Sequence, residues 1–248
     1  KGVFAVALTS TDDLSEGQVR AMLIDGIQQT AGGKFGWSFG GTTGSPTNNV
    51  QRFTVESRLW ETIADAVMPA AVSGNTGLGH TTVAAYSIGT LYAGTAYKMP
   101  YATMITAALA SANRPNAFGN AVPGHAANET HGYIPGGRDA GASYTTIAKL
   151  VFETDFCTNI AGVLQVIGYA RVCTCDGVYV YANCGNTLSY GLTVCDKITL
   201  ANDFVAPHPD GNTPSGNVGF GGLSFPAIAG FISMGSASYK INFSNGQY

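Results

Sequence analysis

The chain has 248 residues, of which only 11% are charged, and a formal net charge of −3 at neutral pH. Ordinary globular proteins carry about 25% charged residues, so this surface has few groups that keep copies of a protein apart in a crowded cytosol. The weak negative charge argues against a nucleic acid partner, and no apolar stretch is long enough to span a membrane. We therefore expect a protein that lies outside the cell or has a surface largely covered by neighbouring molecules.

The N-terminus starts at Lys1 and continues into a short apolar run, residues 3–8, that is typical of a β-strand. A first residue other than Met favours an exported protein whose signal peptide has been removed over a fragment of a longer chain. An unpaired apolar strand promotes aggregation, so we expect it to pair within its own subunit or, as an exchange arm, in a neighbour's sheet. In the second case the side chains that contact the neighbour are Val3, Phe4, Val6 and Leu8.

Three segments of the N-terminal half have features of short helices. Residues 10–30 begin with the N-cap pattern Ser10-x-x-Asp13 and end in glycines. Residues 57–69 place apolar side chains at every fourth position, and residues 100–109 open with a proline, which is favoured at the first helical position. These patterns predict two or three short helices.

Most of the remaining chain has the composition of β-strands. Aromatic residues alternate over 35–39, strand-forming residues fill 82–98 and 144–200, and apolar residues alternate with polar ones over 237–243. Two stretches, 113–142 and 206–222, are rich in Asn, Pro and Gly and are predicted to be long loops. No internal repeat is evident. We predict one mainly β domain (β-rich α+β) over residues 1–248, with antiparallel, sandwich-like sheets and a β-rich core over 144–248.

The sharpest local signal is Asp176-Gly177 between two runs of β-branched and aromatic residues. This pattern is typical of a two-residue type I′ hairpin, which needs positive φ at both central positions. A turn centred there places Cys175 opposite Val178 and Cys173 opposite Val180, on one face.

The β-rich segment contains all five cysteines, Cys157, Cys173, Cys175, Cys184 and Cys195. The single residue between Cys173 and Cys175 is too short a spacing for a typical zinc knuckle, so we expect disulfides, which suit an exported chain. Five is an odd number, and hairpin register argues against a bond from Cys173 to Cys184. The pairings Cys157–Cys173 and Cys175–Cys195 remain open.

The other candidate sites have plainer explanations. His125, Glu129 and His131 share no helix face, so we expect no metal site there. Glu153 and Asp155 are predicted to share a strand face and could do acid–base work in a hydrolase, although two such carboxylates on an exported β protein more often bind calcium or face water. Tyr179 and Tyr181 share a strand face, which suits either a carbohydrate-stacking platform or cross-strand packing.

Two Asn-x-Ser/Thr sequons, at Asn128 and Asn242, are candidate glycosylation sites, although such sequons also occur by chance in a chain rich in Asn, Ser and Thr. They would add glycans to the exported chain.

These features favour a self-assembling structural subunit without enzymatic activity or cofactor, such as a filament, pilus-like or sheath protein at the cell surface. Its expected partners are copies of itself. A viral capsid or tail protein, present in a virion, is the first alternative. A secreted polysaccharide-active hydrolase or a carbohydrate-binding module is the second.

Overall fold

The computed structural model of the protein describes fifteen separate stretches of the chain. They are residues 28–29, 35–40, 47–54, 59–72, 76–79, 83–90, 93–113, 125–138, 142–168, 171–186, 191–209, 212, 219–225, 229–234 and 237–242. Nearly all of the regular structure in these residues is antiparallel β-sheet, which confirms the mainly β prediction.

The strands form five separate sheets, each built from consecutive strands in chain order. The first contains β1 (Gln28–Gln29), β2 (Phe35–Phe39), β3 (Val50–Thr54) and β4 (Leu59–Thr62). The second contains β5 (Thr76–Gly79), β6 (Ala84–Thr90), β7 (Ala93–Pro100) and β8 (Ala107–Ala108). The third contains β9 (Ala126–Ala127), β10 (His131–Pro135), β11 (Thr146–Val151) and β12 (Phe156–Val163).

The last two sheets complete the series. The fourth contains β13 (Val172–Cys175), β14 (Tyr179–Asn186), β15 (Gly191–Thr199) and β16 (Phe204–Pro207). The fifth contains β17 (Gly219–Phe225), β18 (Ala229–Met234) and β19 (Ala237–Asn242). Strands therefore run from residue 28 to residue 242, and the β-rich region is not confined to residues 144–248.

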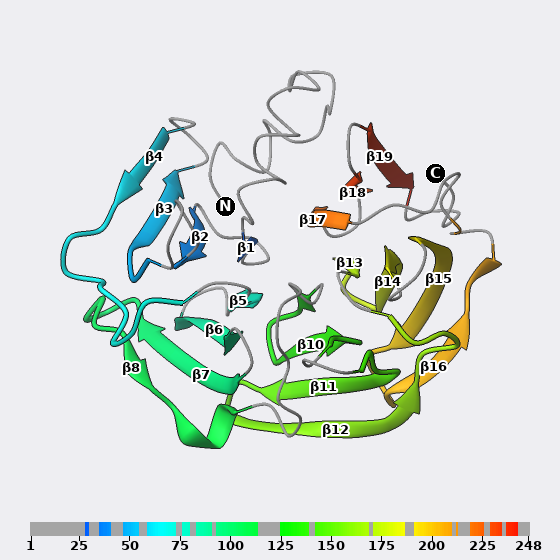
Figure 1. The fold of residues 1–248 in the computed structure, drawn as a ribbon, viewed down its shortest axis with the longest axis horizontal. Helices are drawn as coiled ribbons and strands as arrows, with labels where there is room; N and C mark the ends of the chain where they lie inside the picture. The colour runs from blue at the N-terminus through cyan, green and yellow to red at the C-terminus, as the bar shows by residue number, and fades with distance from the viewer. Residues whose placement is uncertain are drawn as a thin grey trace.

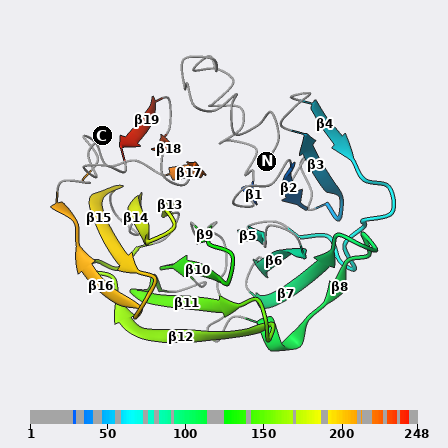
Figure 2. The same cartoon turned by 180° about the vertical axis from the view of Figure 1, so that it is seen from behind.

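The five sheets are arranged around a common centre, as Figure 1 and the reverse view in Figure 2 show. The first strand of each sheet lies nearest the centre and the last lies at the outside. The innermost strands contact one another in a closed circle, in the order β1, β5, β9, β13, β17 and back to β1. Radial up-and-down sheets around one axis define a β-propeller, here with five blades that we number 1 to 5 in chain order.

The hydrophobic core is divided among the joints between successive blades. The joint of blades 1 and 2 buries Trp37, Phe39, Val50, Ala85, Tyr97 and Met99. The joint of blades 2 and 3 buries Tyr86, Ile88, Ile134, Ala148 and Leu150. The joint of blades 3 and 4 buries Tyr133, Ile147, Cys173, Val180 and Ile198. Alternate residues of one strand thus face opposite neighbours in blades 2 and 3, so the sheets of these two blades are buried on both faces. A sandwich, in which two sheets share one core, is therefore not the arrangement found.

The helix predictions are wrong wherever the structure describes the residues. Residues 59–62 form strand β4 and are followed by turns, while residues 101–103 form a turn before β8 and a short 3-10 helix, η2 (Ala110–Ala112). The spacing over 57–69 was misleading because Leu59 and Val67 are both exposed and form no buried helical stripe. The first predicted helix, apart from strand β1, lies outside the described residues, as does the predicted strand over 3–8.

The predicted hairpin is present, but its turn is centred one residue later. Asp176 donates its backbone N–H to the Tyr179 carbonyl (3.2 Å), and the Asp176 carboxylate accepts the N–H groups of Val178 (2.8 Å) and Tyr179 (2.6 Å). Gly177, with a φ of 92°, is therefore the first central residue, as in a type II′ turn. Cys175 consequently pairs with Val180 rather than Val178, and Cys173 pairs with Ala182. The two cysteines keep the common face that the sequence predicted.

Two further strand predictions are confirmed, and both loop predictions are partly wrong, because β17 begins at Gly219, inside the predicted loop over 206–222. The strands over 82–98 correspond to β6 and β7, and the C-terminal strand corresponds to β19. The predicted loop over 113–142 contains β9 and β10, which are the two inner strands of blade 3.

Candidate functional site

Each blade contains a pair of facing residues, one aromatic on its second strand and one basic on its third. The pairs, read from the strand register, are Trp37 with Arg52, Tyr86 with Lys98, Tyr133 with Lys149, Tyr181 with Lys197, and Phe231 with Lys240. In blades 2 and 3 the lysine Nζ lies 5.4 Å from the tyrosine ring centroid, and in blade 1 the Arg52 guanidinium lies 5.9 Å from the Trp37 ring. These are cation–π distances.

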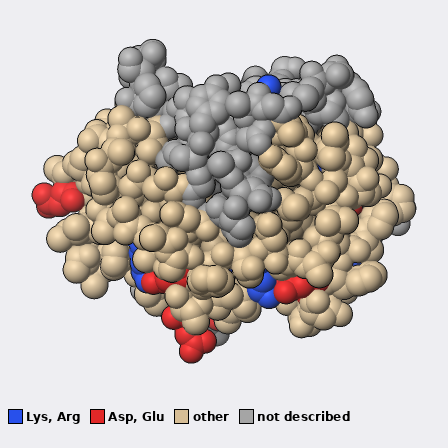
Figure 3. All heavy atoms as spheres, turned by 60° about the horizontal axis from the view of Figure 1, so that its bottom comes forward, with Lys and Arg blue, Asp and Glu red and all other residues tan. Residues whose placement is uncertain are grey.

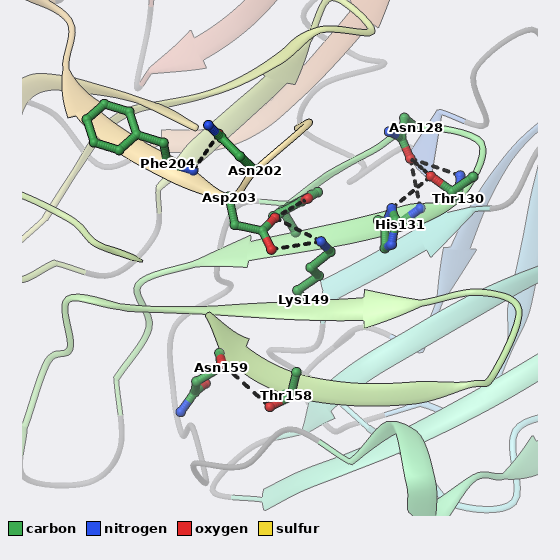
Figure 4. Close-up of polar contacts among 10 residues, drawn as sticks. Asn128, Thr130, His131, Lys149, Thr158, Asn159, Asn202, Asp203 and Phe204 are labelled. Carbon is green, nitrogen blue, oxygen red and sulfur yellow. Dashed lines mark hydrogen bonds and ion pairs between the residues drawn. The ribbon is translucent and has the colours of Figure 1, made fainter. Parts of the chain in front are cut away.

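In blades 2 and 3 this pair also binds an aspartate of the following blade. Lys98 Nζ lies 2.6 Å from one Asp155 oxygen, and the Tyr86 hydroxyl donates to the other at 2.7 Å. Lys149 Nζ lies 2.8 Å from each Asp203 oxygen, and the Tyr133 hydroxyl donates to Asp203 at 2.7 Å. Figure 4 shows the contacts of Lys149 with Asp203. We call each set a Tyr–Lys–Asp cluster.

The two aspartates occupy the same place in their blades. Each is the last residue of the turn between the third and fourth strands, and each has left-handed backbone, with φ values of 56° for Asp155 and 57° for Asp203. Aspartate adopts this conformation more readily than most residues. Met104 has the same left-handed backbone, with a φ of 55°, in the equivalent turn of blade 2.

The joint between blades 1 and 2 is apolar where the later joints are charged. Met104 and Tyr101 pack against the cluster that includes Trp37, and the rings of Trp37 and Tyr101 stack with centroids 5.6 Å apart. Arg52 instead pairs with Glu61 of its own blade, 2.6 Å from Nε to the carboxylate. The same position is thus filled either by a carboxylate that binds a lysine or by an apolar side chain, Met104, that packs against the core of the joint.

The electrostatics of the clusters favour binding over proton transfer. Burial, reinforced by the hydrogen bond to Asp155, raises the pKa of Tyr86 well above its ordinary value. Burial and the bond to Asp203 do the same to the pKa of Tyr133. Both phenols therefore remain protonated donors at any physiological pH. What the clusters can do is join adjacent blades.

In four blades a large, exposed hydrophobic side chain lies at the start of the outermost strand or, in blade 2, two residues before it. The four are Leu59 (65% exposed), Ile105 (63%), Phe156 (56%) and Phe204 (62%), and we call them the rim residues. Each lies seven positions after the basic residue of its blade's aromatic–basic pair. In Figure 4 the Phe204 ring extends away from the Asp203 carboxylate. Exposed apolar groups at related positions are a mark of interaction surfaces.

The sequence contains a repeat that would have revealed this pattern. The basic residues of the pairs are Arg52, Lys98, Lys149, Lys197 and Lys240, at intervals of 46, 51, 48 and 43 residues. Lys149 and Lys197 are both followed, six and seven residues later, by Asp-Phe. A period of about 40–50 residues is typical of propeller blades. The intervals vary because the loops differ in length, which hides the repeat from inspection at a fixed period.

The predicted disulfides are wrong for the cysteines that the structure describes. Cys157, Cys173, Cys175 and Cys195 form no disulfide with one another. Cys157 packs in the joint of blades 2 and 3, whereas Cys173 packs in the joint of blades 3 and 4. Cys175 and Cys195 lie on opposite faces of blade 4, because Cys195 packs beside Tyr181. The side chain of Cys184 lies outside the described residues.

The structure gives the acidic and histidine candidates positions that differ from those expected of a strand-face carboxylate pair or a metal-binding cluster. Glu153 and Asp155 lie in a turn, not on a strand face, and Asp155 is bound by Lys98 and Tyr86. Burial lowers the pKa of His125 to about 4. Among the described residues there is no group of three His, Cys, Asp or Glu side chains that could hold a metal ion.

The two tyrosines proposed as a stacking platform are engaged in packing. Tyr181 is buried and donates its hydroxyl to Asp176 at 2.9 Å. Lys197 Nζ covers the Tyr179 ring at 4.4 Å from the centroid, and the two tyrosine rings meet edge to face. Cross-strand packing, the second of the two explanations, therefore accounts for them.

The structure describes the asparagine side chain of one of the two sequons, Asn128. Asn128 lies in the turn between β9 and β10, and its side-chain oxygen accepts the N–H groups of Thr130 (2.9 Å) and His131 (2.8 Å), as Figure 4 shows. The side chain of Asn242 and the strand candidates Val3, Phe4, Val6 and Leu8 lie outside the described residues, so these sites stay predictions.

Comparison with protein-family models and with curated proteins found no match to this chain. In the part of the chain that the structure describes, no helix is long and apolar enough to cross a membrane.

Proposed function

We propose that this protein is a non-enzymatic structural subunit that assembles with copies of itself through the rim residues. The observation that carries the proposal is the recurrence of an exposed Leu, Ile or Phe at the same position of four blades, Leu59, Ile105, Phe156 and Phe204. Such side chains contribute little to the subunit's own core while they remain in water. They become useful when a neighbour covers them.

The surface composition supports the same proposal. Only 11% of the residues are charged, and uncharged atoms cover most of the described surface visible in Figure 3, with charged side chains in a few small groups. Apolar contacts between copies therefore meet little charge repulsion. Because the rim residues are distributed around a ring, they can contact neighbours in several directions. Contacts in several directions are what a filament, sheath or shell requires.

The size of the effect can be estimated from the exposed fractions. Full burial of a Leu or Phe side chain is worth about 1.5–3 kcal/mol, so a rim side chain that is already partly covered offers about 1–2 kcal/mol. A contact that buries two rim side chains from each copy gains about 4–8 kcal/mol. Association costs about 4–15 kcal/mol, so the contact is close to balance and depends on each rim residue.

The test compares wild-type protein with the triple variant Ile105→Ser, Phe156→Ser, Phe204→Ser. Size-exclusion chromatography with light scattering and negative-stain microscopy should show polymers for wild type and monomers for the variant. Circular dichroism should show the same fold for both, because all three side chains are exposed. The matched control, Ile105→Val, Phe156→Leu, Phe204→Leu, keeps an apolar rim and should still assemble. A wild-type protein that stays monomeric at 25.6 kDa in all conditions tested would overturn the proposal.

We favour an extracellular or cell-surface filament or sheath over a virion. The low charge and the sequons at Asn128 and Asn242 support this location, whereas the described cysteines no longer do, because they form no disulfide with one another. A viral shell or tail would use the same kind of contact, and the shape of the polymers in the microscope separates the two. Of the two carboxylates named for the hydrolase alternative, Asp155 is held in a Tyr–Lys–Asp cluster and Glu153 is exposed in the same turn.

A further inference from the structure

The exposed apolar side chains are not evenly shared between the two faces of the ring. Each blade alternates its strands up and down, so the turns from first to second strand and from third to fourth strand lie at one end. Backbone hydrogen bonds of 3.0 Å join these two turns in three blades, from Tyr101 to Val83, from Phe152 to Thr130, and from Leu200 to Val178. We call this end of the blades, with its turns, the turn face.

The turn face carries two rows of apolar side chains. The outer row is formed by the rim residues. The inner row contains Val83 and Val178, which occupy equivalent positions in blades 2 and 4 and are both exposed. Blade 3 has the polar Thr130 at that position. The outer row therefore recurs in four successive blades, whereas the inner row is apolar in blades 2 and 4.

The opposite end of the blades, where the chain passes from an outermost strand to the next blade, we call the crossover face. Three large hydrophobic side chains are exposed there among the described residues, namely Val67, Val163 and Ile167. Val67 lies between blades 1 and 2, while Val163 and Ile167 lie where the chain leaves blade 3 for blade 4. Both ends of the ring thus offer apolar contact area.

We infer that copies of the protein stack along the propeller axis, with the turn face of one copy on the crossover face of the next. The inference rests on the proposed function and adds the direction of growth. A second copy presents exposed apolar side chains on its crossover face, and these can cover the exposed apolar side chains of the turn face. Contacts between two different faces generate open, continuing assemblies, whereas two identical faces close into a dimer.

Charge and area agree with this arrangement. Glu129 and Glu153 are exposed on the turn face, whereas the described part of the crossover face has the exposed Asp65 and the half-buried Arg138. Two turn faces in contact would therefore bring together more carboxylates than a turn face on a crossover face. A stable interface needs about 800 Å² from each partner, which is less than a tenth of the 10486 Å² surface of one subunit.

The test uses two variants that each disable one face. The turn-face variant is Val83→Asp with Val178→Asp, and the crossover-face variant is Val67→Asp with Ile167→Asp. All four side chains are exposed, and circular dichroism checks that both variants fold. Each variant alone should be monomeric by light scattering. An equal mixture should form dimers and no longer species, because one intact turn face meets one intact crossover face.

Other outcomes separate this inference from the proposed function. Dimers from the crossover-face variant alone would mean that two turn faces meet, which overturns head-to-tail stacking. Normal polymers from both variants, with monomers from the triple rim variant, would mean side-by-side contact. That result overturns the inference and leaves the proposed function intact. A monomeric wild type overturns both.

Discussion

The Tyr–Lys–Asp cluster of blades 3 and 4 should contribute measurably to stability, and Asp203→Asn isolates its charge. Asparagine tolerates the left-handed backbone of this position, where φ is 57°, so the substitution changes the carboxylate and little else. It removes one charge from two lysine contacts of 2.8 Å and leaves a single oxygen acceptor. The Tyr133 hydroxyl can still donate to that oxygen.

The magnitude lies between those of surface and buried pairs. The side chains of Lys149 and Asp203 are 15% and 29% exposed, so solvent screens them only in part. Exposed ion pairs contribute about 0–1 kcal/mol, and hydrogen bonds to charged groups about 1.5–3 kcal/mol. We expect Asp203→Asn to lower the free energy of unfolding by about 1–2 kcal/mol, which for a chain of this size lowers Tm by about 2–8 °C.

The assay is urea unfolding, combined in a double-mutant cycle with Lys149→Met. The two substitutions should couple by about 1 kcal/mol, because each removes the same contact. Glu153→Gln is the control, since Glu153 is an exposed carboxylate on the equivalent turn of blade 3. It should change stability by less than about 0.5 kcal/mol. Additive effects of Asp203→Asn and Lys149→Met, within about 0.3–0.5 kcal/mol, would refute the cluster's role in joining the blades.

Two further predictions concern buried groups. Asp196→Ala should destabilise the protein by about 3–5 kcal/mol in thermal unfolding, because it leaves the buried Arg171 guanidinium without the carboxylate 3.5 Å away. Burial raises the pKa of Asp196, so the folded protein binds this proton more tightly than the unfolded chain does. The free energy of unfolding of wild type, relative to that of Asp196→Asn, should therefore increase as the pH falls toward about 4. Burial also raises the pKa of Cys175 to about 11, so a thiol reagent at pH 8 should label it only after unfolding. If fewer than five thiols react in the unfolded, unreduced protein, the chain must contain a disulfide.

The strands that were correctly predicted from the sequence are those with a clear local signal. Alternation identified β2 and β19, and the Asp176-Gly177 pair identified the hairpin of β13 and β14. The turn moved by one residue because the Asp176 side chain accepts two backbone N–H groups and so replaces a backbone pairing. Local chemistry of this kind allows the type of element to be predicted from the sequence, but it determines the strand register less well.

The false helices and the missed strands have a common cause. A blade that packs against neighbours on both faces buries successive residues, such as Gly132, Tyr133 and Ile134 of the missed strand β10, and so loses the alternation that marks a half-buried strand. Conversely, Leu59 and Val67 gave a helix-like spacing although neither is buried. Of the predicted apolar stripe, only Ile63 packs against the core, and it does so from outside any helix.

The candidate site could have been predicted only through the repeat. No single copy of Lys149 or Lys197 with its following Asp-Phe is a recognised motif, and the joint of blades 1 and 2 replaces the aspartate by Met104. A comparison of the chain with itself at intervals of 43–51 residues is what aligns these positions.

The repeated positions differ in what explains them. The aromatic–basic pairs are explained by packing between strands, and Asp155 and Asp203 by the lysines they bind. The rim residues have no such explanation, because a side chain such as Phe204 leaves 62% of its surface in water. If their role lies in contacts between copies, serine at the rim should leave the free energy of unfolding of the monomer nearly unchanged while it abolishes assembly. A loss of several kcal/mol would instead place the rim residues in the fold itself.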